Sequence, residues 1–262
     1  MTSRWLLLTA GFGSADMNAA AERVRRQAVS LGIFDKVLAF SDSDLETACP
    51  NVYKKYREFL SPSHKGFGYF SWKVELVSSA LEGKFGDYEG VVWVDAGCEI
   101  YNSPWTRFRL RRWMKRAIKE GVFAYTLNTP EQDFTKKALF DLFPNLNRDD
   151  RGPQFQATWF ILHGDRGRLI ASEWLRIALL NISTLDLSTS PGGEVDSFVE
   201  HRSEQSILSL IFKSLGSKRA IFYFPYSGLG TSKSKLIAYS NPIWVTRNRT
   251  GVSIIQTLRT HD

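Results

Sequence analysis

A chain of 262 residues, of which 43% are hydrophobic and 13% aromatic, can bury the core of one large α/β domain, and this composition excludes disordered and fibrous proteins. Its two cysteines exclude a disulfide framework and a cysteine metal cluster, so a reducing compartment is expected. The 34 basic and 27 acidic residues give a net charge of +7, which favours polyanionic partners such as anionic lipid or phosphorylated substrates.

The first half of the sequence alternates predicted strands and helices, as in an α/β protein with a mostly parallel, Rossmann-like sheet. Apolar runs predict strands at 5–11, at 36–41 and within 91–100. Helical spacing of apolar residues predicts helices at 15–32 and at 71–83, the second with Ser71 as its N-cap.

The third of these strands, in GVVWVDAG, is apolar without alternation, which is typical of a strand that is covered on both faces of a parallel sheet. Asp95 is then expected at its carboxyl end. In open α/β sheets ligands bind at this edge, so Asp95 is a candidate ligand-binding residue.

The second half continues the same alternation. Strands are predicted at 121–128 and 155–164, and helices at 106–121, 133–143, 166–180 and 201–216, with a loop at 188–196. The last 45 residues give mixed strand and turn signals, and none of them is assigned a role.

The helix at 106–121 carries a dense set of basic residues beside an apolar stripe. This pattern is typical of a solvated helix face, and it also fits contact with an anionic membrane surface or with a phosphorylated acceptor. Nucleic acid is not expected as a partner, because no zinc-ligand spacing, heptad run or RNA-binding aromatic motif accompanies the charge. No run of about 18 apolar residues predicts a membrane span, so we expect a cytoplasmic protein, either free or peripheral at the inner face of the membrane.

Three segments contain residues suited to binding a nucleotide or an anion. Gly11 and Gly13 follow the first strand, but Asp16 stands at the third glycine position of a dinucleotide fingerprint, so a simple tight turn is equally compatible. In HKGFGYFSWK, glycine-rich backbone and Lys73 suit an anion, and aromatic rings suit a flat base, although an aromatic cap on the core has the same pattern.

In the third segment, Asp95 stands beside Ala96 and Gly97, whose small side chains let a ligand approach the backbone. A carboxylate here suits a ribose hydroxyl or a divalent ion that neutralises a diphosphate. Glu99 lies on the same strand face but too far along an extended chain for joint chelation, so a turn at Gly97 would be needed.

The segment EHRSEQS places His201 and Glu204 one helical turn apart, with Gln205 beside them. These residue types suit a general base, a metal ligand or a clamp on sugar hydroxyls. A polar first helical turn with Ser203 as its cap is the alternative interpretation.

Taken in order, several segments resemble one family: RVRRQAVSLGIFD, GFGYFSWK, VVWVDAGCEI, FTKKALFDL, QFQATWFIL, SEW and EHRSEQSILSLI. They are similar to the bacterial and viral nucleotide-diphospho-sugar transferases of GT-A type that act on surface polysaccharides such as capsule or lipopolysaccharide. The resemblance spans roughly residues 5–215 and implies one GT-A-like domain over 1–262. Residues 1–128 would form the nucleotide-sugar half and 129–262 the acceptor half.

The resemblance also implies roles for particular residues. Glu204 and Asp95 would be catalytic, with Glu204 the candidate base if the reaction inverts the anomeric centre. The nucleotide sugar would be bound by Gly11, Arg23, Gly68, Trp72, Lys73, Asp95, Ala96 and Gly97. The acceptor side would include Lys136, Gln156, His201, Arg202 and Gln205.

Three positions depart from the family pattern. Gly97 replaces the second acid of the Asp-x-Asp motif, so Asp95 would either share a Mn²⁺ or Mg²⁺ ion with a distant partner such as His201 or work without a metal. Val74 replaces a proline, and Glu204 replaces an aspartate.

The function implied by the resemblance is transfer of a sugar from a nucleotide-diphosphate sugar to a hydroxyl of a glycan or lipid-linked glycan. The alternatives are a nucleotidyltransferase or Rossmann oxidoreductase, and a glycan- or nucleotide-binding module without turnover. The missing second acid favours the binding module. The absence of a basic glycine-rich loop in TAGFGSADM argues against a nucleotidyltransferase.

Overall fold

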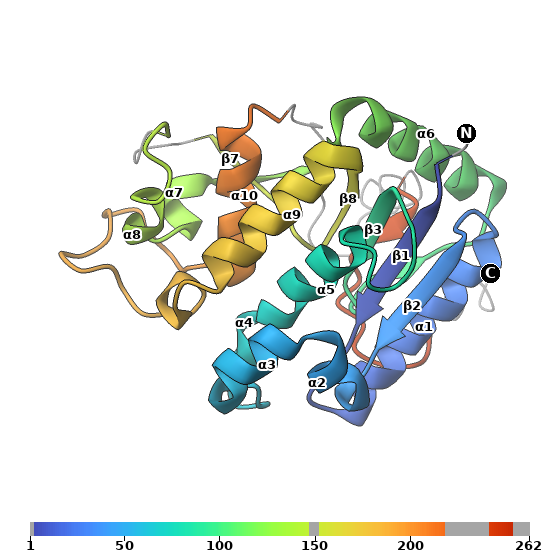
Figure 1. Cartoon of the computed structure of the whole chain (residues 1–262), viewed down its shortest axis with the longest axis horizontal. Helices are drawn as coiled ribbons and strands as arrows, with labels where there is room; N and C mark the ends of the chain where they lie inside the picture. Colours follow the sequence, from blue (N-terminus) through green and yellow to red (C-terminus); the bar gives the residue numbers. More distant parts are fainter. Residues whose placement is uncertain (1–2, 147–151, 218–240, 254–262) are drawn as a thin grey trace, which may run out of the picture.

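The computed structural model of the chain describes residues 3–146, 152–217 and 241–253. Its centre is a five-stranded sheet with the order β2-β1-β3-β8-β5 (Figure 1). The strands are β1 (Trp5–Ala10), β2 (Lys36–Phe40), β3 (Gly90–Val94), β5 (Val122–Phe123) and β8 (Trp159–His163). The strands predicted at 5–11 and 36–41 and in the GVVWVDAG run are therefore confirmed.

The sheet is mostly parallel, as predicted. β1 is parallel to both β2 and β3, whereas β8 is antiparallel to β3 and to β5, so four strands share one direction and only β8 is reversed. The carboxyl ends of β1, β2 and β3 therefore meet at one edge of the sheet, the edge at which Asp95 was expected.

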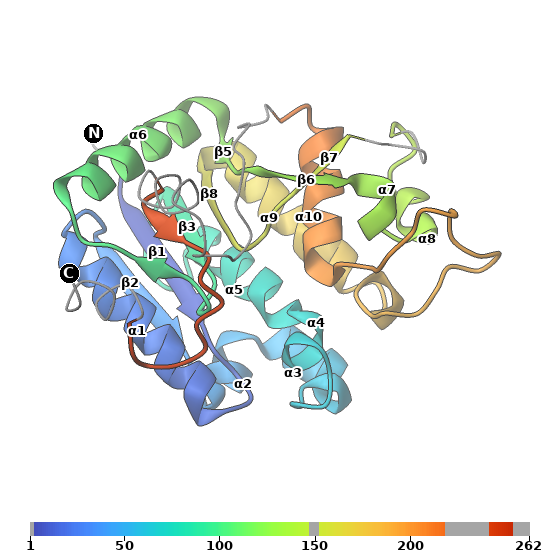
Figure 2. The ribbon, with the colours of Figure 1, turned by 180° about the vertical axis from the view of Figure 1, so that it is seen from behind.

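Helices cover both faces of this sheet (Figures 1 and 2). One face packs against α1 (Ala15–Leu31) and α6 (Pro104–Glu120), and the other against α5 (Ser71–Leu81), α9 (Gly164–Ala178) and α10 (Ser203–Ser214). All five were predicted as helices. The described residues thus form a three-layer α/β arrangement, in agreement with the expected fold class.

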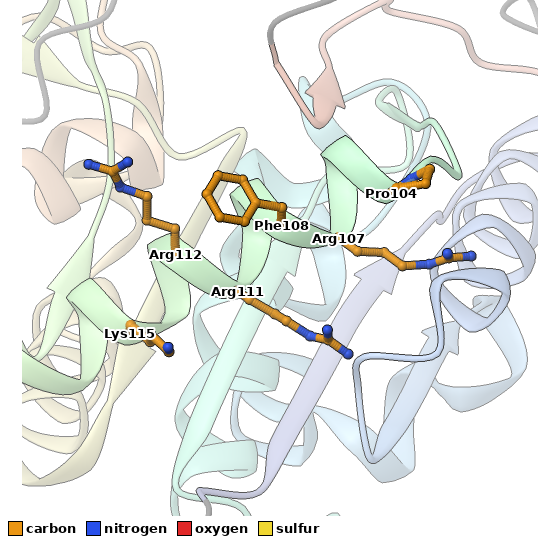
Figure 3. A pocket seen from close by; sticks show the side chains of 6 residues that line it. All are labelled: Pro104, Arg107, Phe108, Arg111, Arg112 and Lys115. Carbon is orange, nitrogen blue, oxygen red and sulfur yellow. The ribbon is translucent and has the colours of Figure 1, made fainter.

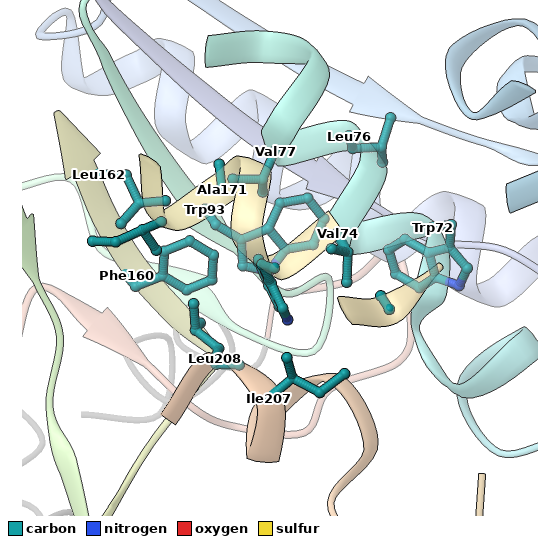
Figure 4. Packing of buried hydrophobic residues seen from close by; sticks show 14 of the residues in the cluster. Trp72, Val74, Leu76, Val77, Trp93, Phe160, Leu162, Ala171, Ile207 and Leu208 are labelled. Atoms are coloured by element: carbon teal, nitrogen blue, oxygen red, sulfur yellow. The ribbon is translucent and has the colours of Figure 1, made fainter. Parts of the chain in front are cut away.

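The absence of alternation in β3 has a direct explanation in this packing. Val91 and Trp93 face the cluster that contains α5, α9 and α10, whereas Val92 and Val94 face the cluster that contains α1 and α6. Figure 4 shows the first cluster, in which Trp93 lies among side chains from α5, β8, α9 and α10. Every residue of β3 is buried, so no position favours a polar side chain.

Two predictions of long elements are wrong. The helix expected at 133–143 is two short helices, α7 (Glu131–Phe134) and α8 (Lys137–Phe140), separated by extended backbone at Thr135 and Lys136. The side chains of these two residues explain the break, because Thr135 donates to Glu131 and Lys136 donates to the Ser183 carbonyl.

The strand expected at 121–128 is divided between β5 and β6 (Thr126–Pro130), and β6 pairs with β7 (Pro153–Phe155) in a separate sheet. The strand expected at 155–164 is accordingly divided as well. Phe155 is the last residue of β7 in the small sheet, and Trp159–His163 form β8 in the central sheet. The change of sheet leaves residues 156–158 between strands, beside Asp95, whose amide donates to the Thr158 carbonyl at 2.8 Å.

Short elements complete the described chain. They are α2 (Leu45–Ala48), α3 (Pro50–Tyr56), α4 (Gly66–Tyr69), the 3-10 helices Asp42–Asp44, Arg57–Phe59 and Ile182–Thr184, and a β4 (Glu99–Ile100) and β9 (Ile243–Trp244) pair. Most of the carboxyl-terminal tract with mixed signals lies outside the described residues. Within the described ranges, no helix has the length and apolar character of a membrane span.

Candidate active site

A pocket of about 560 Å³ lies at the carboxyl ends of β1 and β3. Its walls come from six separate parts of the chain: the β1–α1 turn, residues 62–73, the turn after β3, residues 157–158, the residues around the start of α10 and the segment 245–249. The candidate catalytic residues Asp95 and Glu204 both line it, and so do Lys73, Ala96 and Gly97. The fold therefore brings these five residues together from distant segments.

Lys73 joins the two carboxylates at the floor of this pocket. Its Nζ atom lies 2.9 Å from Oδ1 of Asp95 and 2.7 Å from Oε1 of Glu204, and its side chain is 2% exposed. The indole of Trp93 donates a second hydrogen bond of 2.7 Å to the same Asp95 oxygen. Lys73 therefore compensates two negative charges in a place that water hardly reaches.

Burial and neighbouring charges shift the pKa values of Lys73 and Glu204. Burial alone lowers the pKa of Lys73, but the neighbouring Asp95 and Glu204 charges outweigh burial and raise that pKa above its ordinary value. Burial raises the pKa of Glu204, and the Lys73 charge opposes this rise only in part. Lys73 thus stays protonated, and Glu204 is a stronger base than an exposed glutamate.

A left-handed turn in front of α5 forms one wall of the pocket. All five residues from 66 to 70 have positive φ angles, including Phe67 at 55° and Phe70 at 60°. Such angles are strained for residues other than glycine, and strain of this kind concentrates at functional sites. Because Phe70 occupies the N-cap position in this conformation, the prediction that Ser71 caps the helix is wrong.

Aromatic rings line the same wall. Phe12 and Phe67 are stacked with ring centroids 6.1 Å apart, and Trp72 meets Phe12 edge-on at 4.7 Å. All three line the pocket, and the Trp72 indole is held by the Gly66 carbonyl at 3.0 Å. Gly68 shapes this wall through its backbone, since a Cβ atom there would lie 2.7 Å from Leu60.

The opposite wall comes from the carboxyl-terminal segment, which places Arg247 and Arg249 at the pocket. Arg23 holds this segment in position. Its buried guanidinium donates to the carbonyls of Ala96 at 2.8 Å, Cys98 at 2.9 Å and Asn248 at 3.0 Å, and also to that of Thr250. The structure therefore places Arg23 behind the pocket wall, where it does not reach the expected nucleotide site.

Glu99 belongs to the same support. A turn does form after Asp95, whose carbonyl accepts from the Cys98 amide, but the Glu99 side chain remains fully buried away from Asp95. Its carboxylate accepts hydrogen bonds from Asn248 at 2.8 Å and Ser253 at 2.5 Å. Glu99 thus fixes the segment that carries the two arginines.

The start of α10 supplies the third wall. Arg202 lies over the Phe134 ring at 3.5 Å, and Gln205 accepts from the Ala157 amide at 3.1 Å. Both line the pocket. Ser203 also lines it; its hydroxyl is buried and has no hydrogen-bond partner among the described residues.

Besides Arg23 and Gly68, four residues expected at the site do not line the pocket. Lys136 is buried and forms an ion pair with Asp186 at 3.0 Å. Gln156 is buried beside Tyr125, and its backbone N–H donates to the Tyr125 carbonyl. Gly11 lies under α1, where a Cβ atom would come within 2.0 Å of the Met17 carbonyl oxygen. The fourth, His201, is buried between the start of α8 and the residue Thr184.

Both ring nitrogens of His201 have backbone partners. Nε2 donates to the Thr184 carbonyl at 3.0 Å, and Nδ1 faces the Lys136 amide at 3.4 Å. Burial, followed by the Lys136 charge, lowers the pKa of His201 to about 3. His201 is therefore a neutral structural residue, and the structure does not bring it to Asp95.

The expected metal pair of Asp95 and His201 is thus not formed. Oδ1 of Asp95 is already shared by Lys73 and Trp93, and no group of three or more His, Cys, Asp or Glu side chains is placed to hold an ion in the described ranges. The described residues do not fit a divalent cation held at Asp95 by the protein.

Several pocket residues were missed by the sequence analysis. Lys65, which pairs with Glu200 at 2.9 Å, lies directly before the glycine-aromatic segment, so its position could have been noticed. Nothing local marks Arg247 or Arg249, because their place depends on contacts with α1 and with the turn after β3.

No protein-family model and no curated protein matches this sequence. Among solved structures, the chain is similar to mouse xyloside xylosyltransferase 1 in its apo form, with a TM-score of 0.46 and 12% identity over 95% of this chain and 100% of the other. It is also similar to a glycosyltransferase involved in the glycosylation of the major capsid of PBCV-1, with a TM-score of 0.44 and 10% identity over 90% and 98% of the two chains.

Proposed function

We propose that this chain is a GT-A-type glycosyltransferase that transfers a sugar from a nucleotide diphosphate to a hydroxyl of a glycan or glycolipid acceptor in surface polysaccharide synthesis. The observation that carries this proposal is the buried contact of Lys73 with both Asp95 and Glu204 at the floor of the pocket. A carboxylate for the donor, a carboxylate that can take the acceptor proton in an inverting transfer, and a fixed positive charge between them suit this reaction.

The diphosphate would bind among the cations of the pocket. Lys65, Arg202, Arg247 and Arg249 line it together with Lys73, against the acids Asp95, Glu200 and Glu204. The first turn of α1 also lies here, because its N-cap Ser14 lines the pocket, and a helix N-terminus favours negative charge. These groups would stabilise the diphosphate as it leaves.

The nucleoside would bind at the aromatic wall. The rings of Phe12 and Phe67 offer a stacking surface of the kind that bases use. Asp95 has a side chain that is 29% exposed, so its carboxylate can accept a hydrogen bond from a ribose or sugar hydroxyl. The small Ala96 and Gly97 leave room for the donor against the backbone.

In the transfer step, the bond between the anomeric carbon and the diphosphate oxygen breaks, and a bond forms to the acceptor oxygen. If the configuration inverts, the acceptor proton passes to Glu204, whose raised pKa suits a general base. Lys73 orients this carboxylate and compensates its charge until the proton arrives.

We propose that the cations of the chain, and not a metal held by the protein, neutralise the leaving diphosphate. The support is the position of Lys73 at Asp95 and the two arginines opposite. Turnover is then expected to persist in EDTA, without a requirement for Mn²⁺ or Mg²⁺.

The proposal is tested by measuring donor hydrolysis and transfer with a panel of nucleotide-diphosphate sugars, each with EDTA and with Mn²⁺. Turnover of at least one donor, lost in Asp95→Asn, supports the proposal. Tight donor binding without turnover of any donor would instead indicate a nucleotide- or glycan-binding module. Absence of donor binding throughout the panel would overturn the proposal.

A further inference from the structure

The outer face of α6 is cationic and exposes aromatic residues. Phe108, Arg111, Arg112 and Lys115 follow one another at helical spacing and line a surface groove with Pro104 and Arg107 (Figure 3). Trp105 and Phe108 are 48% and 55% exposed, although their rings stack at 5.7 Å. We call this set, from Pro104 to Lys119, the α6 surface.

Three exposed basic residues of the α6 surface have no ion-pair partner among the described residues. The helix contains seven arginines and lysines and one acid, Glu120. Arg111, Arg112 and Lys115 are exposed, and they form no ion pair with a described residue. Uncompensated like charges repel one another, so this face is electrostatically suited to a polyanion.

The exposed aromatic residues narrow the choice of polyanion. Leu110, Trp113, Met114 and Ala117 already supply the buried stripe of α6, so Trp105, Phe108 and the 47% exposed Ile118 have no core to enter. Large apolar side chains beside arginines and lysines match the level of a bilayer where acyl chains meet phosphate headgroups. This combination favours an anionic membrane surface over nucleic acid.

The α6 surface lies far from the catalytic pocket. Arg107 donates to the carbonyl of Leu31 at 3.0 Å, at the last residue of α1, whereas Ser14 at the first turn of α1 lines the pocket. The helix between them has 17 residues and is therefore about 25 Å long. Both views place α6 beside the beginning of β1 (Figures 1 and 2). The pocket lies at the other end of that strand, where Ala10 and Phe12 line it.

We propose that the α6 surface docks the protein on anionic membranes, with Trp105 and Phe108 at the headgroup boundary and the basic side chains on lipid phosphates. The pocket at the other end of α1 stays open to donor and acceptor in this orientation. Docking does not depend on the proposed transferase reaction.

The test is co-sedimentation of the intact protein with vesicles of phosphatidylcholine, and with vesicles that also contain phosphatidylglycerol. Binding is expected only to the second kind, and it should weaken as salt increases. The variant Arg111→Gln/Arg112→Gln/Lys115→Gln should bind about 100-fold more weakly, since each basic residue at such a surface contributes about a factor of five in affinity. Trp105→Ala/Phe108→Ala should bind more weakly at every salt concentration, because it removes the apolar contribution.

The matched control is Lys36→Gln/Lys54→Gln/Lys84→Gln, which removes the same charge from exposed positions outside α6. Vesicle binding of this control should stay within a few-fold of the wild type, and circular dichroism should show that all variants are folded. Equal losses in both triple variants would overturn the proposal, because they would indicate attraction by net charge alone. Lack of binding to phosphatidylglycerol vesicles, or a preference for DNA or RNA in competition, would overturn it as well.

Discussion

The Nζ atom of Lys73 lies 2.7 Å from Oε1 of Glu204, although 131 positions of sequence separate the two residues. Lys73 comes from the first turn of α5, and Glu204 from the first turn of α10. Both helices cover the same face of the sheet, so their first turns meet beside the carboxyl end of β3, where Asp95 completes the group. The proposed chemistry depends on this contact.

Replacement of Lys73 by methionine should destabilise the fold strongly. The variant leaves two carboxylates without their buried cation, a change that costs about 3–5 kcal/mol when one partner of a buried pair is removed. Urea unfolding measures the loss. Adding Asp95→Asn and Glu204→Gln to the same chain should recover most of it.

The control for this effect is Lys84→Met, because Lys84 pairs with Glu82 at 3.3 Å and both side chains are nearly half exposed. Its free energy of unfolding should change by less than about 1 kcal/mol. Comparable losses for Lys73→Met and Lys84→Met would contradict the assigned burial of the Lys73 group.

Glu204→Gln should abolish transfer and spare donor binding. A glutamine keeps the size of the side chain but cannot take the acceptor proton, so kcat should fall by about 100-fold or more. Isothermal calorimetry with the donor gives the binding constant, which should stay within a few-fold of the wild-type value. Loss of donor affinity would place Glu204 on the nucleotide side.

Arg23→Met and Arg247→Ala should both weaken donor binding, but for different reasons. Arg23 donates to the carbonyls of Ala96, Cys98 and Asn248, so its loss should destabilise the protein by at least about 2 kcal/mol and expose the segment 246–253 to protease. Arg247 is exposed at the pocket, so its variant should unfold within about 0.5 kcal/mol of the wild type. Unchanged donor affinity in Arg247→Ala would remove that residue from the diphosphate site.

Stability should decrease in mild acid because of His201. The pKa of His201 is about 3 in the folded protein and 6.5 when exposed, so the unfolded chain binds one more proton between these values. Proton binding therefore stabilises the unfolded chain relative to the folded protein as the pH falls through 6.5. At pH 5 this contribution is about 2 kcal/mol relative to pH 8. Urea unfolding across this range should show a smaller slope for His201→Gln, and an identical slope would contradict the assignment.

Gly11→Ala and Gly97→Ala should differ sharply, although both change a glycine near the pocket. A Cβ atom at Gly11 would lie 2.0 Å from the Met17 carbonyl oxygen, so the start of α1 must shift, at a cost of about 1–3 kcal/mol or more. At Gly97 the nearest atom, the Arg247 Cα, would be 3.6 Å away, an ordinary contact. Thermal unfolding should therefore leave Gly97→Ala nearly unchanged; equal destabilisation would show that the turn after Asp95 is tighter than described.

Much of the layer structure was predictable from local patterns. The helices at 71–83, 166–180 and 201–216 repeat apolar residues every three or four positions, and each of them is found within two residues at either end. The helix expected at 133–143 has an apolar pattern that is compatible with a helix, but the prediction is wrong. Thr135 bonds to Glu131 and Lys136 to the distant Ser183 carbonyl, and the apolar pattern does not reveal these bonds.

The candidate site divides in a similar way. Asp95, Lys73 and Glu204 were selected from a strand end and from two helix starts, which are positions where the fold class places ligands. His201 and Lys136 come from equally polar segments, yet they turn away from the pocket and bind backbone carbonyls. Residue type and spacing do not show whether a polar residue will line the pocket or bond within the protein, because a buried polar group finds hydrogen-bond partners in either place.

The sequence by itself determined the sheet, its covering helices and the acid at the end of β3, because apolar periodicity and strand ends are local properties. Only the tertiary structure decided that Lys73 stands between Asp95 and Glu204, that Arg23 supports the pocket wall, and that Arg247 and Arg249 line the pocket. Except for the Lys73–Asp95 pair, these contacts join segments more than 70 positions apart. The chain forms them only when burial of its apolar faces has fixed how the helices pack.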